Sequence, residues 1–169
     1  MATAARAGLW RIVLLLLAAA LQSLPGARMA AAQDASPFVR LAGRWLGEGR
    51  LGFTGGKTEA VKCRVTYIVT EQGQQVRQTI RCATESGSVE VQSTVSHASG
   101  TLTGSWKELS RDWSGELAGS VNANGFKVAI KGAELKANMD IIVKENRQII
   151  EIQFIDSSLI GLTLVLAKG

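Results

Sequence analysis

Apolar and polar residues alternate along most of the chain after Leu41, and clusters of Gly, Asn or Ser interrupt the alternation every eight to twelve residues. A period of two is typical of strands that bury one face, and the interruptions are typical of turns. The pattern predicts about ten strands, near residues 42–53, 57–69, 74–83, 87–97, 100–107, 112–121, 125–132, 137–144, 147–155 and 159–167. Because the connections are short, neighbouring strands should pair antiparallel.

Ten strands with one dominant apolar face must bury that face, and closure into a barrel does so while removing exposed edges. We therefore expect an all-β fold, an antiparallel up-and-down β-barrel. A short helical turn should precede it, because in DASPFVRLAG Ser36 can cap a helix and Pro37 can take its first position. No helical stretch lies between the strands, which argues against an alternating α/β fold.

The first 32 residues have the three parts of a secretory signal peptide. Arg6 and Arg11 form a basic region, residues 12–21 are apolar, and Ala30-Ala31-Ala32 offers the small residues of a cleavage site. The apolar part is too short to span a bilayer comfortably, although an uncleaved anchor is the alternative. We expect cleavage after Ala32, a single barrel domain over residues 33–169, no stable membrane span after cleavage, and a periplasmic or secreted protein of a bacterium.

Removal of this segment changes the charge of the chain. It holds three of the 19 basic residues and no acidic one, so 16 basic and 14 acidic residues remain. No basic stripe with interleaved aromatic residues is left. Nucleic-acid binding is therefore not expected.

Both cysteines of the chain lie in KCRVTYIVTEQGQQVRQTIRC, residues 62–82. A hairpin folded about Gln72-Gly73 places Cys63 opposite Cys82, and the same register pairs Val65 with Ile80, Tyr67 with Gln78 and Val69 with Val76. Directly opposed cysteines on adjacent strands can form a disulfide, and an exported protein meets an oxidising compartment. We predict a Cys63–Cys82 bridge.

The other face of this hairpin is basic, with Lys62, Arg64, Arg77 and Arg81. Arg64 faces Arg81 in the same register, and Glu90 on the next strand can lie beside Arg81. Two interpretations stay open: a site for anions or lipid headgroups, or a solvated sheet face that is partly neutralised.

A candidate ligand site follows from two further hairpins. Folding GTLTGSWKELSRDWSGELAG about Leu109-Ser110 pairs Trp106 with Trp113 and Gly104 with Gly115, and folding VNANGFKVAIKG about Ala123-Asn124 pairs Gly115 with Gly132. This predicts a row of three glycines beside two indoles. The row can be a slot for a flat apolar ligand, or it can let the sheet bend so that the barrel closes.

The last strands are the most apolar. Leu162, Leu164 and Leu166 are expected to face Phe154, Ile152 and Ile150 inside the barrel. Ile142, Ile149 and Ile155 fall on the opposite face, where they mark either a dimer contact or plain outer wall.

Catalysis finds no support in the sequence. It has no GxSxG, Gly-rich phosphate loop or HExxH motif, and we expect no enzyme, no metal and no cofactor. The single histidine, His97, lies in the turn-like SHASG and is expected to be an exposed loop residue.

Gly43-x-Trp45 in LAGRWLGEGRL resembles the start of the calycin barrels, a group that includes lipocalins, fatty-acid-binding proteins, avidins and nitrobindins. The resemblance implies that Trp45 seals one end of the barrel. A lipocalin also has a late arginine beside that tryptophan, but the late Arg147 here falls in a turn, and the haem of nitrobindins needs a late histidine that this chain lacks. Over residues 33–169 the sequence is also similar to uncharacterised exported proteins of alphaproteobacteria.

Three functions of different class follow. The first is binding of a small lipophilic ligand in the periplasm. The second is a protein-binding module such as a protease inhibitor, and the third is an envelope structural protein without a ligand. A hollow interior distinguishes the first function from the third.

Overall fold

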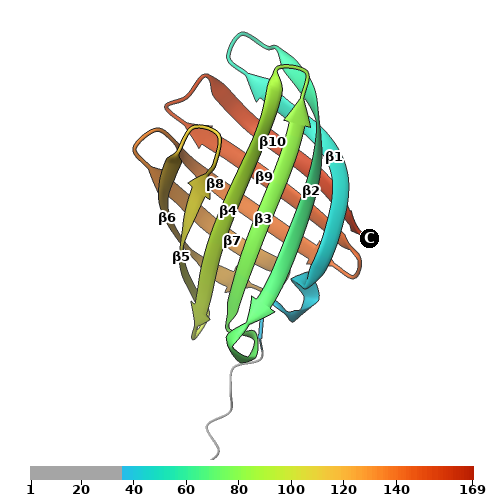
Figure 1. The fold of residues 1–169 in the computed structure, drawn as a ribbon, viewed down its shortest axis with the longest axis vertical. Helices are drawn as coiled ribbons and strands as arrows, with labels where there is room; N and C mark the ends of the chain where they lie inside the picture. Colours follow the sequence, from blue (N-terminus) through green and yellow to red (C-terminus); the bar gives the residue numbers. More distant parts are fainter. Residues whose placement is uncertain (1–35) are drawn as a thin grey trace, which may run out of the picture. The chain divides into compact units, whose positions relative to one another are not determined.

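Ten antiparallel strands close into a barrel in this computed structural model, which describes residues 36–169 (Figure 1). The predicted signal peptide and its cleavage site lie outside the described residues. Two 3₁₀ turns accompany the strands: η1 (Val39–Leu41) and η2 (Glu71–Gly73). The strands are β1 (Gly43–Phe53), β2 (Thr58–Thr70), β3 (Gln75–Thr84), β4 (Gly87–Ala98), β5 (Thr101–Glu108), β6 (Trp113–Asn122), β7 (Gly125–Gly132), β8 (Lys136–Lys144), β9 (Arg147–Ile155) and β10 (Leu159–Lys168).

The topology is the predicted one. Each strand pairs with its neighbours in sequence, and β1 closes the barrel against β10. No strand begins or ends more than one residue from its predicted position. In Figure 1 the strands β2, β3 and β4 form the near wall, and β8, β9 and β10 cross behind them. The N-terminal turn and the β2–β3 turn mark the lower end, and the β1–β2, β3–β4 and β9–β10 turns mark the upper end.

Closure of the barrel depends on a close approach of β1 to β10. A Cβ atom on Gly47 would lie 2.0 Å from the carbonyl oxygen of Val165, and one on Gly49 would lie 1.8 Å from that of Thr163. No side chain fits in these gaps, so glycine is required at both positions.

Trp45 lies in the packed lower end of the barrel. The Trp45 side chain is fully buried, and its indole Nε1 donates a hydrogen bond to the Leu41 carbonyl (2.7 Å). Lys168, at the end of β10, places its Nζ 5.5 Å from the centre of the Trp45 ring. Lys168 therefore makes a cation–π contact with Trp45. Phe38, which is also buried, stacks on Phe126.

The short N-terminal helix begins later than predicted. It is a 3₁₀ turn over Val39–Leu41 whose N-cap is Phe38, with no side-chain cap. Ser36 does not cap it, because its hydroxyl donates to the Gly73 carbonyl in the β2–β3 turn while accepting from the Phe38 N–H. The serine instead ties the chain that enters β1 to the lower end of the barrel.

The β2–β3 hairpin has the predicted register. Cys63 lies opposite Cys82 and the two form a disulfide, while the three other inward pairs also occur as expected. On the outer face Arg64 lies opposite Arg81, and Arg81 lies opposite Glu90 on β4. The β6–β7 register is also confirmed.

The predicted register between β9 and β10 was wrong by two residues. Leu162, Leu164 and Leu166 lie opposite Ile152, Ile150 and Gln148, because the chain turns through residues 156–158. Asp156 has a positive φ of 51° in this turn. The inward and outward faces are unaffected, so Ile142, Ile149 and Ile155 lie on the outer face and are exposed.

We predict that the disulfide contributes about 3 kcal/mol to the free energy of unfolding, because it closes a loop of 19 residues in the unfolded chain. The double variant Cys63→Ser, Cys82→Ser should unfold at lower denaturant concentration while keeping its β-sheet circular dichroism. Wild-type protein under reducing conditions provides the matched control. Equal stability of oxidised and reduced protein would contradict this prediction.

Candidate functional site

The interior of the barrel is incompletely filled. Side chains that point into a closed, solid barrel are inaccessible to solvent, yet a set of inward-facing apolar residues here is only partly buried. They come from β3, β4, β6, β7, β8, β9 and β10, and they include Ile80, Cys82, Val91, Trp113, Ile130, Met139, Ile152 and Leu162. These residues give the barrel an inward-facing apolar surface that stays partly accessible to solvent. We call these eight residues the cup.

The floor of the cup is formed by the packed core of the lower end. There Tyr67 on β2 reaches across to β9, and its hydroxyl donates to Oε1 of Gln148 (3.1 Å). Both residues are buried, and burial raises the pKa of the Tyr67 hydroxyl well above its usual range. Nε2 of Gln148 has no hydrogen-bond partner within residues 36–169. This contact links β2 to β9 across the barrel.

Trp106 occupies the space that two of the predicted site glycines leave. The indole is 6% exposed, and a Cβ atom on either Gly115 or Gly132 would lie 2.8 Å from one of its ring atoms. Its Nε1 also donates to the Lys131 carbonyl at 3.4 Å. Gly115 and Gly132 therefore make room for a side chain of the protein itself.

The predicted row of three glycines was wrong in its first member. Gly115 lies opposite Gly132, as expected, but Gly104 lies opposite Leu117 and Trp106 lies opposite Gly115. A Cβ atom on Gly104 would lie 2.2 Å from the Thr94 carbonyl oxygen, so the backbone of β4 fills that position. The geometry at all three glycines supports the bending role.

Trp113 is the tryptophan that lines the cup. It does not face Trp106 but lies opposite Glu108, because the β5–β6 turn contains four residues rather than two. The turn is held by Glu108, whose carboxylate accepts from the backbone N–H groups of Ser110 (2.9 Å) and Arg111 (2.7 Å). Burial opposes ionisation of Glu108, yet these two donors hold the pKa of its carboxyl below the ordinary value. The alternation of apolar and polar residues does not reveal that a carboxylate is buried and binds a turn, so the sequence analysis missed Glu108.

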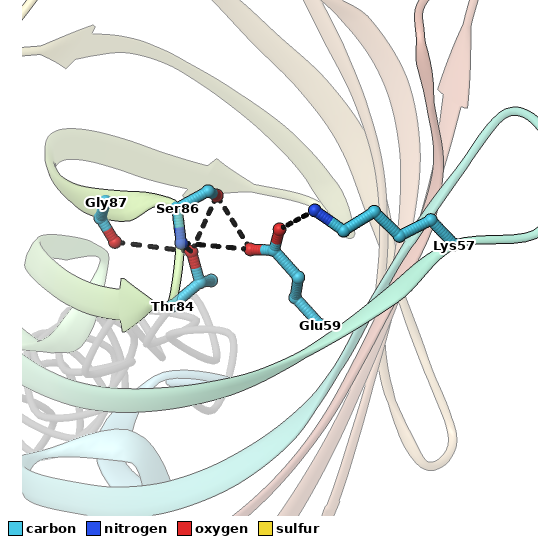
Figure 2. Close-up of polar contacts among 5 residues, drawn as sticks. All are labelled: Lys57, Glu59, Thr84, Ser86 and Gly87. Carbon is cyan, nitrogen blue, oxygen red and sulfur yellow. Dashed lines mark hydrogen bonds and ion pairs between the residues drawn. The ribbon is translucent and has the colours of Figure 1, made fainter.

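A second buried carboxylate, that of Glu59, lies at the upper rim (Figure 2). Nζ of Lys57 donates to Oε1 at 2.8 Å, and the Ser86 hydroxyl donates to Oε2 at 2.7 Å. Ser86 belongs to the β3–β4 turn, so Glu59 joins this turn to the start of β2. The hydrogen bond from Lys57, followed by that from Ser86, lowers the pKa of Glu59 to about 2.

The predicted exposure of His97 was wrong. His97 lies within β4, is half-buried, and makes an edge contact with Phe38 at a centroid distance of 6.3 Å. Its Nε2 accepts from the Gly100 N–H (2.9 Å), so Nδ1 carries the proton and donates to Gln74 (2.7 Å). Through these contacts His97 helps to pack the lower end of the barrel.

Residues 36–169 contain no group of three or more His, Cys, Asp or Glu side chains placed to hold a metal ion. The same residues include no helix with the length and apolar character needed to cross a membrane. The inward-facing positions thus offer apolar side chains, the half-buried indole of Trp113, the polar pair Gln78 and Ser93, and two carboxylates that hold turns.

Comparison with known proteins identifies the fold. No known protein family matches the sequence, and no curated protein matches it significantly. Rv2717c from M. tuberculosis has a similar structure, with a TM-score of 0.66 and 13% identity over 78% of this chain and 94% of that one. The S-type phycobiliprotein lyase CPES from Guillardia theta is also similar, with a TM-score of 0.58 and 9% identity over 78% of this chain and 90% of that one. These similarities show the fold alone, an antiparallel β-barrel that this chain shares with both proteins.

Gly115→Ala should destabilise the protein by about 1–3 kcal/mol, because the new methyl group would lie 1.9 Å from the Lys131 carbonyl oxygen and force either β7 or Trp106 to move. Gly52→Ala is the matched control, since its Cβ would meet only the Gly161 carbonyl oxygen, at 3.7 Å. Chemical denaturation measures both effects. Equal stability of the two variants would show that Gly115 is not needed for packing.

Acid should weaken the upper rim through Glu59. The folded-state pKa of about 2 lies below the ordinary unfolded value of about 4.3, so the stabilisation is complete above that value and is lost as the pH falls from about 5 toward 2. Glu59→Gln should therefore show a shallower loss of stability over this range, measured by urea unfolding at several pH values. Lys57→Met should fall between wild type and Glu59→Gln. Identical slopes for wild type and Glu59→Gln would refute the assignment.

Proposed function

We propose that this protein is an exported, non-catalytic β-barrel that binds a small lipophilic molecule in the bacterial periplasm. The observation that carries the proposal is the cup: apolar side chains such as Met139, Ile152 and Leu162 point into the barrel and remain partly accessible there. Contact between water and these apolar side chains is unfavourable. An apolar ligand would remove both its own surface and the surface of the cup from water, which favours binding. Barrels of about this size hold one small ligand in other proteins.

Trp113 supplies the most specific surface for this ligand. Its ring is half-buried in the cup, and the Arg111 guanidinium lies 5.4 Å from the ring centre. An indole offers a large flat contact at low entropic cost. We infer that the ligand lies against Trp113 and the aliphatic side chains of the far wall, rather than on Gly104, Gly115 and Gly132.

Export is supported by the tripartite N-terminus and by the disulfide, which is typical of oxidising compartments. Membership in the exported alphaproteobacterial group rests on the sequence resemblance. The structural neighbour named a phycobiliprotein lyase has a similar barrel, and this is compatible with ligand binding by the fold. The sealed lower end and the apolar cup favour a ligand over a solid structural role.

Protein recovered from the periplasm of its own cell should have the mass of a chain that begins at Gln33, together with a retained small molecule. Native mass spectrometry measures both quantities on one sample. The denatured protein should lose the added mass, and the released compound should partition into organic solvent. A full-length chain in the membrane fraction would contradict export, and a bare mature chain that also binds no lipophilic probe would contradict ligand binding.

The variant Met139→Trp tests ligand binding in the cup with purified protein. In a hollow barrel the larger side chain should be accommodated and should lower the affinity for the neutral probe N-phenyl-1-naphthylamine at least tenfold, with the stability little changed. In a solid core the same change should destabilise the protein by about 1–3 kcal/mol, as expected for an envelope structural protein. Ile142→Trp, on the outer face of the same strand, is the control and should change neither property.

A further inference from the structure

The outer wall of the barrel carries a groove that the proposed function does not use. The groove has a volume of about 1040 Å³ and crosses β9, β10, β1, β2, β3 and β4. Four basic and two acidic residues line it: Lys62, Arg64, Arg81, Arg147, Glu48 and Glu90. Leu46, Val165 and Ala167 add apolar surface between them. The groove is therefore both cationic and apolar, which is unusual for a solvated sheet face.

The strand registers place most of the cations in one row. Arg147 on β9, Arg64 on β2 and Arg81 on β3 lie in the same row, with the small or apolar Ala167 and Leu46 between the first two. Arg81 is neutralised, because its Nε and Nη2 donate to the two carboxylate oxygens of Glu90 at 2.9 and 3.0 Å.

Arg64 is not compensated in this way. It makes no ion pair within residues 36–169, and its cross-strand neighbours are Leu46 and the cation Arg81. The ion pair of Arg81 with Glu90 thus leaves the charge of Arg64 without a compensating group among the described residues. A negatively charged partner outside the chain would therefore stabilise the Arg64 side of the row.

A row of exposed aliphatic residues runs beside the cations. Ile142 lies opposite Ile149, and Ile149 lies opposite Val165, so three adjacent strands present branched side chains to solvent. These residues are 43%, 38% and 43% exposed. Leu46, within the cationic row itself, is 50% exposed. Together they form a contiguous apolar strip on the outer wall.

We propose that this face of the outer wall, over β8, β9, β10, β1, β2 and β3, docks onto an anionic lipid bilayer. Lipid phosphates would neutralise Arg64 and Arg147, and the aliphatic strip would enter the interfacial region beneath the headgroups. A free phosphate would engage the cations but leave the strip in water. The proposal goes beyond ligand binding in the cup, and it places the barrel at a surface where lipophilic molecules are held.

The charge dependence can be measured with vesicle flotation. Wild-type protein should bind vesicles of phosphatidylglycerol and phosphatidylcholine, should bind pure phosphatidylcholine far less, and should be released by salt. The double variant Arg64→Gln, Arg147→Gln should bind about 30-fold more weakly, because each basic residue near the membrane surface contributes about fivefold to the affinity. Lys131→Gln with Lys136→Gln removes the same charge from β7 and β8, outside the groove, and should weaken binding far less.

The aliphatic strip distinguishes a bilayer from a soluble polyanion. Ile149→Ser with Val165→Ser should weaken vesicle binding at least tenfold. Val39→Ser with Ile155→Ser is the control and should not, because Val39 lies in η1 and Ile155 lies at the end of β9 remote from the strip, and both are at least as exposed as Ile149. All four double variants lie on the surface, and their folds are verified by thermal unfolding.

Three results would overturn the proposal. The first is failure of wild-type protein to bind the anionic vesicles at low salt, and the second is equal weakening by the two charge pairs. The third combines two observations: the Ile149→Ser, Val165→Ser protein binds anionic vesicles with unaltered affinity, and dextran sulfate competes fully with the vesicles. Together they would assign the groove to soluble anions or an acidic protein. None of these results depends on whether the cup is occupied.

Discussion

The structure depends on the close approach of β1 to β10, where no side chain fits between Gly47 or Gly49 and the carbonyl oxygens of the opposite strand. This approach bends the sheet tightly enough to join its two edges. Once it is joined, Trp45 is enclosed from all sides and Lys168 comes to lie over its ring. The enclosed interior follows from this seam together with the bends at Gly104 and Gly115.

The enclosed interior is divided along its length. Aromatic and aliphatic side chains pack completely at the lower end, with the Tyr67–Gln148 hydrogen bond tying the walls together. Above them the inward-facing apolar side chains of the cup are only partly buried. Two buried carboxylates, Glu59 and Glu108, fix the β3–β4 and β5–β6 turns at the rim. The cup thus lies between a packed floor and a rim whose turns are held by charge-assisted hydrogen bonds.

Much of the fold follows from the sequence because the period of two determines which face of each strand is buried. The same period leaves the register ambiguous, since a slip of two residues keeps every side chain on its face. This ambiguity explains the errors at β5–β6 and β9–β10, where turn length could not be deduced. The cysteine pair removed it at β2–β3, where Cys63 can bridge only a directly opposed residue. At the candidate site, the error in the β5–β6 register hid the fact that Trp106 covers Gly115 and Gly132.

The pairing of β1 with β10 also has a consequence for the order of folding. Residues 43–53 find their partners at residues 159–168, whereas the β2–β3 hairpin closes over a short loop. Contacts between residues that are far apart in the sequence form more slowly than contacts within a hairpin, so the β1–β10 pairing is expected to form later. The hairpin that carries the disulfide can therefore form early. Trp45 and the apolar lining of the barrel stay open to water until the last strand is in place.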